Sequence, residues 1–328
     1  MPVREFSLDL YPPVHQTYEQ RKAKGLTRAG LLASRLGVKA EVLRGKRLLE
    51  IGCGYGADSV NVEEVYGANV VGIDPWPRWK KGPNKKRDIF HVVDIADPAV
   101  LELGQFDYAF SQAVFEHVER PRAALQNLFK LLKPGGRAFL KYNLYLGCSS
   151  SHLVKYLGLP WVQLTHSDAE VRALMLEKTG REQSCEFVNR ASYAHYLRWF
   201  DDIGFKLINC SYDTIKMSDE FYKEHYEKLK YYDRTDLETD FMLVLLEKPA
   251  VTLAQGSGDA EAISKPDHPL AATPAGDGGS PVAARAAGAP VTKPAARVGK
   301  PPAPPVKRSI LSRGRSFLGR LKRSLVKA

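Results

Sequence analysis

The chain has 328 residues, of which 44% are hydrophobic, with 48 Lys and Arg against 37 Asp and Glu. This length suits one large domain or two small ones, and the hydrophobic content permits a full core. No stretch approaches the ~18 consecutive apolar residues of a membrane-spanning helix, and the first residues lack the apolar segment of a signal peptide. The four cysteines form no C-x-x-C pair, so we expect reduced thiols in a cytoplasmic protein.

The first informative elements are a strand, a turn and a helix. Residues 27–36 have helical spacing, and we expect this segment to pack over the ligand side of the domain. Residues 48–51 form an apolar run short enough for a buried parallel strand. Glycine, which lets a ligand approach the backbone closely, stands at every second position of the next turn: Gly52, Gly54 and Gly56. With the helical spacing of residues 57–66, this pattern predicts an α/β domain that binds a nucleotide-like ligand at the strand's carboxyl end.

Acidic residues follow the next two apolar runs. Residues 69–73 end at Asp74, and residues 89–93 end at Asp94. An acid about 20 residues after the glycine turn accepts hydrogen bonds from ribose hydroxyls, and a carboxylate at Asp94 could meet an adenine amino group. The glycine turn also satisfies the dinucleotide fingerprint G-x-G-x-x-G/A, so an NAD-type cofactor stays open at this point.

Two further motifs narrow the choice of cofactor. A fourth run, residues 106–111, leads into E-H-V at 116–118, and L-K-P-G-G at 132–136 precedes a fifth run. In this order and spacing, the series resembles the class I S-adenosylmethionine (SAM)-dependent methyltransferases, closely over residues 45–145 and loosely to about 249. The resemblance implies an α/β fold with a Rossmann-like, seven-stranded, mostly parallel sheet and a reversed last strand. It also implies SAM as the cofactor and methyl transfer as the reaction.

The resemblance also implies roles for single residues. Glu50, Gly52 and Gly54 would line the methionine end of SAM, and Asp74 would hold the ribose. Asp94 and its neighbour would contact the adenine. The cofactor-binding residues expected from the family pattern are Glu50, Gly52, Cys53, Gly54, Gly56, Asp74, Asp94, Ile95 and Gln112, the last beneath the sulfonium.

A long stretch, residues 143–203, separates the fifth and sixth strands. The capping box that begins at Ser167 predicts a helix there, and a second helix is expected around residues 193–203, before a strand at 205–210. In the family, an insertion at this place forms the substrate cover, so we expect a helical cover insertion that determines acceptor specificity. The folded methyltransferase domain is expected to comprise residues 1–249, with a last strand at 241–247.

The candidate general bases are histidines near the predicted cleft. Methyl transfer is an in-line displacement in which positioning supplies most of the acceleration, and a base is needed only for a poor nucleophile such as a sugar hydroxyl. His117 is the best placed because it follows the fourth strand, and His166 and His195 lie in the cover. His152 is a fourth histidine near the mouth. The alternative for each is a structural role.

Two more patterns suggest binding sites, but for each a non-functional interpretation is favoured. Glu116 and His117 match part of the E-x-x-E-H ligand set of metal-dependent methyltransferases, but Ala113 stands at the first position. Two ligands leave a site incomplete, so we predict no metal. The loop at 76–87 has six basic residues and two tryptophans, and could bind a phosphate-bearing substrate, although a solvated loop is favoured.

The C-terminal end differs in composition from the rest. Residues 250–306 are rich in Pro, Ala, Gly, Ser and Thr, which predicts a disordered linker. Residues 307–328 combine basic residues with an apolar stripe that includes Phe317 and Leu321, a pattern typical of an interfacial helix on anionic lipid. A solubilising tail, a partner-docking helix and a nucleic-acid patch remain alternatives.

Together these features indicate a SAM-dependent O-methyltransferase. The cover and the basic tail favour a glycan or lipid-linked acceptor near a membrane, with a cytoplasmic or peripheral inner-face location. A quinone-type small molecule, an RNA acceptor and a non-catalytic SAM-binding scaffold are the alternatives. A nucleic-acid partner is disfavoured because the positive charge lies in the tail and not over the domain face.

Overall fold

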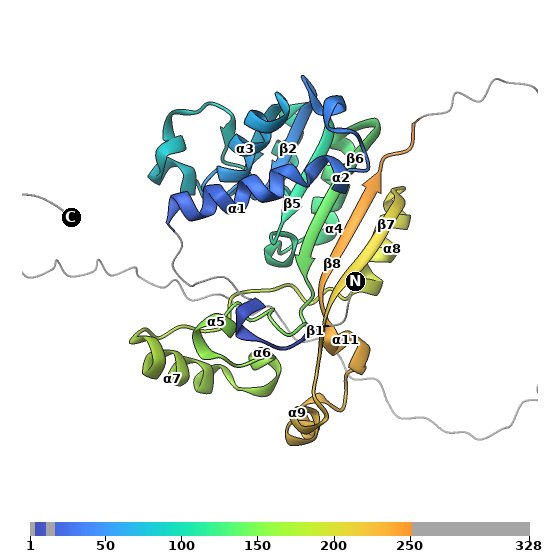
Figure 1. The fold of residues 1–328 in the computed structure, drawn as a ribbon. Coiled ribbons are helices and arrows are strands. Elements are labelled where there is room, and N and C mark those ends of the chain that lie inside the picture. The colour runs from blue at the N-terminus through green and yellow to red at the C-terminus, as the bar shows by residue number, and fades with distance from the viewer. Residues whose placement is uncertain (1–3, 11–16, 251–328) are drawn as a thin grey trace, which may run out of the picture. The chain divides into compact units, whose positions relative to one another are not determined.

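The computed structural model describes residues 4–10 and 17–250, all within one unit of the chain. These residues form an eight-stranded sheet with helices on both faces (Figure 1). The strand order is β1-β7-β8-β6-β5-β2-β3-β4. The strands are β1 (Arg4–Glu5), β2 (Arg47–Ile51), β3 (Asn69–Ile73), β4 (Phe90–His91), β5 (Phe106–Gln112), β6 (Leu132–Asn143), β7 (Lys206–Lys216) and β8 (Thr239–Glu247).

The predicted reversal of the last strand is confirmed. Strands β2 to β6 pair in parallel, whereas β8 lies antiparallel between β6 and β7. The sheet has one strand more than the seven expected, because β1 pairs in parallel with the end of β7. A two-residue strand carries no hydrophobic alternation that a sequence could reveal. Strand β4 is also shorter than the predicted run 89–93.

One face of the sheet is covered by α1 (Tyr18–Gly30), α2 (Leu32–Arg35) and α3 (Ala57–Tyr66). Helix α1 begins well before the expected start at Thr27, because Thr17 and Gln20 form a capping box. Tyr66 of α3 donates its hydroxyl to the carbonyl of Ala29 at 2.6 Å, which joins the two helices.

The other face is covered by α4 (Pro121–Leu131) and α8 (Tyr193–Ile203). Helix α8 was expected inside the cover insertion. Its buried residues Tyr196 and Phe200 instead join the core between α4 and the sheet, so the cover ends before this helix.

A separate group of helices lies beyond the carboxyl ends of the parallel strands (Figure 1). One part follows β6 and contains the helix that the capping box at Ser167 predicted. The other part lies between β7 and β8, and the sequence analysis predicted no helix there. The indole N–H of Trp161 in the first part donates to the carbonyl of Leu237 in the second at 2.8 Å. We call these two parts the cover; its helices are α5 (Val154–Leu157), α6 (Val162–Thr165), α7 (Asp168–Thr179), α9 (Asp219–Glu224), α10 (Tyr226–Leu229) and α11 (Arg234–Glu238).

The predicted linker and basic helix, residues 251–328 of the chain, lie outside the described residues. Within the described part, no helix is both long and apolar enough to cross a bilayer.

Candidate active site

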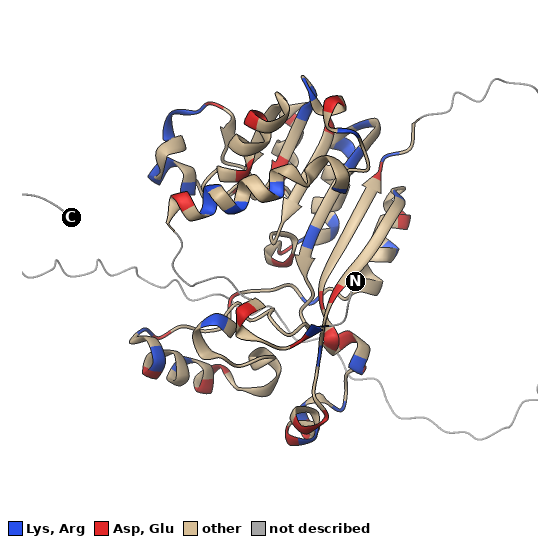
Figure 2. Ribbon diagram, in the orientation of Figure 1, with Lys and Arg blue, Asp and Glu red and all other residues tan. Residues whose placement is uncertain are grey.

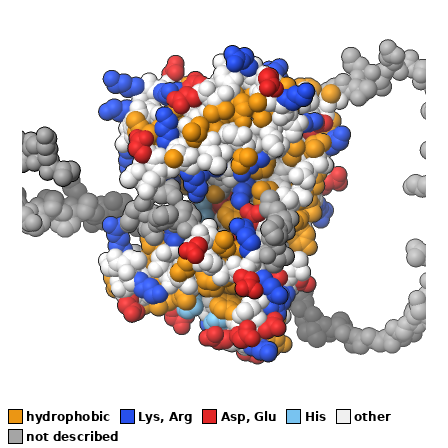
Figure 3. Space-filling view, in the orientation of Figure 1, with side chains coloured by type: hydrophobic (Ala, Val, Ile, Leu, Met, Phe, Trp, Pro, Cys, Tyr) orange, Lys and Arg blue, Asp and Glu red, His pale blue; other side chains and the backbone are white. Residues whose placement is uncertain are grey.

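A cavity of about 620 Å³ opens where the parallel strands end and the cover begins. The space-filling view shows this hollow between the two halves of the molecule, with basic side chains around it (Figure 3). Its walls come from α1, the turn after β2, the ends of β5 to β8, and the cover. Five of the predicted cofactor residues line it together: Glu50, Gly52, Cys53, Gly54 and Gln112.

The turn after β2 requires its glycines for two different reasons. All three have positive φ angles, of 76°, 53° and 75° at Gly52, Gly54 and Gly56. A Cβ at Gly52 would lie 2.2 Å from Val114, and one at Gly56 would lie 2.3 Å from the ring of Phe90. A Cβ at Gly54 would meet nothing within 4 Å, so this glycine faces the open cavity. The turn thus packs tightly against Val114 and Phe90 on one side and exposes its backbone to the cavity at Gly54.

Glu50 is the acidic group beside this turn. It is 6% exposed and accepts a hydrogen bond from the hydroxyl of Ser59. Burial and the nearby carboxylate of Asp58 raise the pKa of Glu50 to about 8. A cationic ligand group placed beside Glu50 would favour the ionised form and lower this pKa again.

Gly56, Asp74, Asp94 and Ile95 are not among the residues that line the cavity; the last three follow the ends of β3 and β4. Asp74 is 7% exposed and accepts hydrogen bonds from the backbone N–H groups of Gly54 at 2.9 Å and Trp76 at 2.8 Å. Asp94 is exposed and accepts one from the N–H of Ala96 at 2.8 Å. Ile95 is buried. The acids therefore follow adjacent strands, as the sequence predicted.

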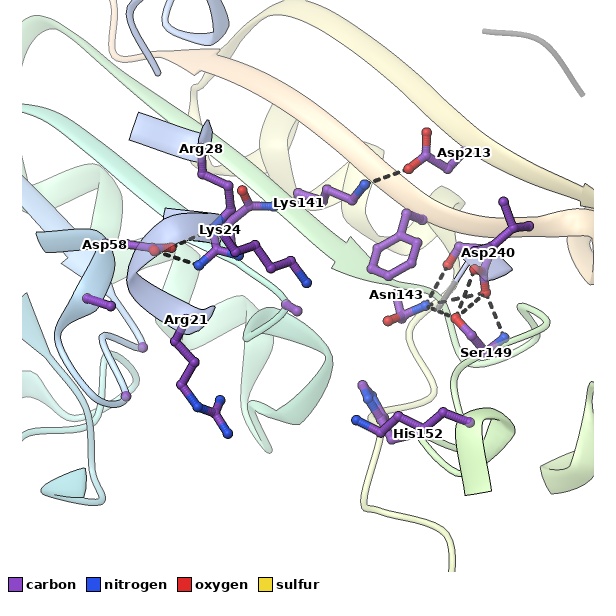
Figure 4. Close-up of a pocket in the computed structure, with 18 of the residues that line it drawn as sticks. Arg21, Lys24, Arg28, Asp58, Lys141, Asn143, Ser149, His152, Asp213 and Asp240 are labelled. Carbon is purple, nitrogen blue, oxygen red and sulfur yellow. Dashed lines mark hydrogen bonds and ion pairs between the residues drawn. The ribbon is translucent and has the colours of Figure 1, made fainter. Parts of the chain in front are cut away.

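Helix α1 contributes a row of basic side chains that sequence reasoning missed. Arg21, Lys24 and Arg28 extend from it into the cavity (Figure 4), and Figure 2 shows basic residues along its length. Arg28 forms an ion pair with Asp58 of α3, at 2.5 Å between Nη2 and Oδ1. The spacing of three to four residues between Arg21, Lys24 and Arg28 was the sequence signal that could have placed them on one face of a helix. From the basic loop after β3, Arg78 lines the same cavity.

A polar network on the facing wall was also missed. Asp240, 2% exposed, accepts hydrogen bonds from the Ser149 hydroxyl at 2.8 Å and from the Ser149 N–H at 2.8 Å. The side-chain amide of Asn143 donates to Ser149 Oγ at 3.0 Å (Figure 4). Burial, opposed by the Ser149 hydrogen bonds, raises the pKa of Asp240 to about 6. All three residues line the cavity.

The structure separates the predicted histidines. His117 is half-buried, and its Nδ1 lies 2.7 Å from the carbonyl oxygen of Phe187. His166 contacts Thr165 in the cover, and His195 caps the exposed start of α8 with Ser192. These three do not line the cavity, so their positions lend no support to the predicted catalytic role.

His152 lines the cavity and lies next to His117, with 4.7 Å between ring centroids. Burial lowers the pKa of His152 to about 3, and its Nε2 has no hydrogen-bond partner among the described residues. Within the described ranges, neither carboxylate oxygen of the buried Glu116 accepts a well-formed hydrogen bond. Ligand atoms of these three residues lie within 4.8 Å of one another, so they could hold a metal ion. The sequence identified only two of the three donors, and the absence of a metal stays a prediction.

Comparison with known proteins agrees with this geometry. Residues 18–209 match the model of a family described as a methyltransferase domain. A ubiquinone biosynthesis O-methyltransferase of Xanthomonas oryzae is 35% identical over 104 residues, which cover 30% of this chain and 43% of that protein. A tRNA U34 carboxymethyltransferase of Saccharophagus degradans is 32% identical over 108 residues, 30% of this chain and 33% of that protein. The matches thus span less than half of these relatives.

Among solved structures, a SAM-dependent methyltransferase from Mesorhizobium loti is 17% identical with a TM-score of 0.41, over 68% of this chain and 99% of that one. The family model covers more than half of the chain. The chain therefore belongs to the class I methyltransferases, enzymes that use SAM as their cofactor.

Proposed function

We propose that this chain transfers a methyl group to an oxygen atom of a glycan or lipid-linked acceptor held between the sheet and the cover. One observation carries the proposal: the glycine turn and the Asn143–Ser149–Asp240 network line the same cavity. In Figure 4, Asp58 and Arg28 lie on one side of this cavity, and Asp240 and His152 lie on the other. A cofactor at the turn would thus face an acceptor bound beside the network.

The cofactor residues are assigned as follows. When bound, SAM supplies a methyl group on a positively charged sulfur. Glu50 would bind the amino group of its methionine part, and the open face of Gly54 would lie against the same part. Asp74 would accept hydrogen bonds from the ribose, and Asp94 and Ile95 would contact the adenine. Gln112, whose Oε1 accepts a hydrogen bond from Arg35 at 2.9 Å, would lie beneath the sulfonium.

Asp240 is the best-placed general base for an acceptor hydroxyl. With a pKa of about 6 it is ionised at neutral pH, and it is still basic enough to take a proton. His152 also lines the cavity, but with a pKa of about 3 it is a far weaker base. Ser149 holds the Asp240 carboxylate by two hydrogen bonds, so the base is fixed in orientation.

The alternatives differ in acceptor class. The names of the relatives favour a quinone-type small molecule or an RNA. A chain that binds SAM without turnover would be a scaffold. We expect label from methyl-labelled SAM to enter a bacterial envelope extract in the presence of the full-length chain, in a product that ribonuclease does not degrade. Ribonuclease-sensitive label would move the assignment to RNA, and binding of SAM with no labelled product would support the scaffold.

Peripheral membrane association is a separate part of the proposal and depends on residues 307–328. Each Lys or Arg near an anionic surface contributes on the order of 1 kcal/mol. The full-length chain should therefore bind phosphatidylglycerol vesicles at low salt, and a chain truncated after Pro249 should not. Phe317→Asp with Leu321→Asp should abolish binding. A full-length chain that ignores such vesicles would show that the tail has another role.

A further inference from the structure

The cavity holds a cluster of cationic groups that comes from three separate elements. Lys24 extends from α1, Lys141 from β6 and Lys155 from α5, and all three line the cavity. The pKa of Lys24 is lowered, first because the cavity walls partly exclude water from its ammonium group and then because the charge of Arg28 repels it. Asp58 acts in the opposite direction, and Lys155 and Lys141 add smaller repulsions. Lys141 and Lys155 are thus close enough to Lys24 to disfavour its charged form.

The acidic residues of the cavity neutralise only part of this cluster. Asp58 pairs with Arg28, and Asp213 pairs with Lys141 at 2.5 Å (Figure 4). In the described part of the chain, Lys24 and Lys155 have no acidic side chain within ion-pair distance. An unneutralised cluster of this kind attracts a negatively charged ligand.

Binding of SAM would not neutralise the positive charge of this cluster. SAM has one carboxylate but also an ammonium and a sulfonium, so its net charge is positive. Its ammonium is assigned to Glu50, and Arg21 of α1, which stacks on Tyr55 of the glycine turn at 4.9 Å, is available near the turn for its carboxylate. Binding of the cofactor therefore adds positive charge to a cavity that already has an excess of it.

We propose that Lys24, Lys141 and Lys155 form a subsite for a phosphate group of the acceptor. This inference rests on the proposed methyl transfer and names the chemistry of its acceptor. Three ammonium groups from three separate elements suit the terminal oxygens and the double charge of a phosphate. A single carboxylate would leave part of the cluster unneutralised. The phosphate can belong to a water-soluble sugar phosphate or to a lipid-linked carrier.

The test is calorimetric titration of the full-length chain saturated with S-adenosylhomocysteine. We use inorganic pyrophosphate as the probe and malonate as a dicarboxylate of comparable size. Pyrophosphate should bind at least tenfold more tightly than malonate, and its affinity should fall with added salt. A third titration with farnesyl pyrophosphate separates the sources. A further gain of tenfold or more indicates a lipid-linked acceptor, and equal affinity indicates a water-soluble one.

Variants locate the subsite. Lys24→Gln and Lys155→Gln should each weaken pyrophosphate binding by about tenfold and leave S-adenosylhomocysteine affinity unchanged. Lys22→Gln is the matched control, because Lys22 lies on the same helix, pairs with Glu64 at 3.8 Å and does not line the cavity. It should bind pyrophosphate as the unaltered chain does.

Several outcomes would overturn the inference. Equal binding of malonate and pyrophosphate, or pyrophosphate binding that ignores both variants, would exclude a phosphate subsite at these lysines. Loss of S-adenosylhomocysteine affinity in Lys24→Gln would assign Lys24 to the cofactor's carboxylate. Failure of the unaltered chain to bind S-adenosylhomocysteine at all would instead reject the proposed function, so the two failures are distinguishable.

Discussion

Arg28 and Asp58 form a two-point ion pair, with 2.7 Å between Nε and Oδ2 and 2.5 Å between Nη2 and Oδ1. This pair joins α1 to the first turn of α3, which itself follows the glycine turn. Together with the hydrogen bond from Tyr66 to Ala29, this pair holds α1, and with it Lys24, beside the cavity.

Removing one partner of this pair should destabilise the domain. Asp58→Asn leaves a partly buried guanidinium without its charge partner, and we expect a loss of about 1.5–3 kcal/mol in the free energy of unfolding by urea. Asp202→Asn is the control, because its pair with Arg122 is largely exposed and should contribute about 0–1 kcal/mol. Equal losses in the two variants would mean that the Arg28 pair has no special role.

The glycine turn offers a matched pair of substitutions. Gly52→Ala places a methyl group 2.2 Å from Val114 at a positive φ, so we expect lower stability as well as lost cofactor binding. Gly54→Ala places its methyl group in the open cavity. It should reduce S-adenosylhomocysteine affinity at least tenfold with a smaller loss of stability. Thermal unfolding and calorimetry separate the two effects; a Gly54→Ala chain with full affinity would contradict the assignment of this face to the cofactor.

Cofactor affinity should depend on pH through Glu50. The free protein holds this carboxyl neutral below its pKa of about 8, whereas a bound ammonium group favours the ionised carboxylate. Binding therefore releases a proton, and affinity should rise by up to about tenfold per pH unit from pH 6 to 8 and level off above. Calorimetry in two buffers of different ionisation enthalpy measures the released proton. Glu50→Gln should bind weakly and without this pH dependence.

Turnover should depend on Asp240. If this carboxylate is the base, kcat/KM should rise with pH through about 6, where Asp240 ionises, and Asp240→Asn should lower kcat by about 10²–10⁴-fold. S-adenosylhomocysteine affinity should be unchanged. His166→Ala and His195→Ala are controls that should retain activity, since neither residue lines the cavity. A large loss in either control with intact folding would return the catalytic role to the cover histidines.

Chelation should leave turnover unchanged, because Ala113 stands where the E-x-x-E-H ligand set of metal-dependent methyltransferases has a carboxylate. The measurement is methyl transfer after dialysis against EDTA, compared with the same sample supplied with Mg²⁺ or Mn²⁺. If activity is lost and returns with the ion, Glu116, His117 and His152 hold a metal after all. Loss of that response in His152→Ala would then identify the site.

The parts of the site that follow from local sequence were predictable. The apolar run 48–51, its glycines and the acids Asp74 and Asp94 belong to strands and turns whose positions depend on neighbours in the chain. Lys24 and Asp240 were not predictable, because each reaches the cavity through the packing of a distant element. The second part of the cover was also missed, since helices of four to six residues leave too short a hydrophobic pattern to detect.

The hydrogen bond between the Trp161 indole and the Leu237 carbonyl has a consequence for how this architecture can diversify. Since Trp161 is almost fully buried, replacing only one of the two chain segments that meet there would leave a buried polar group unsatisfied, at a cost of about 1–3 kcal/mol. A chimera that exchanges residues 144–190 alone should fold poorly, and one that also exchanges residues 217–238 should recover. Acceptor selectivity in such an architecture would then be transferred only by exchanging both segments together.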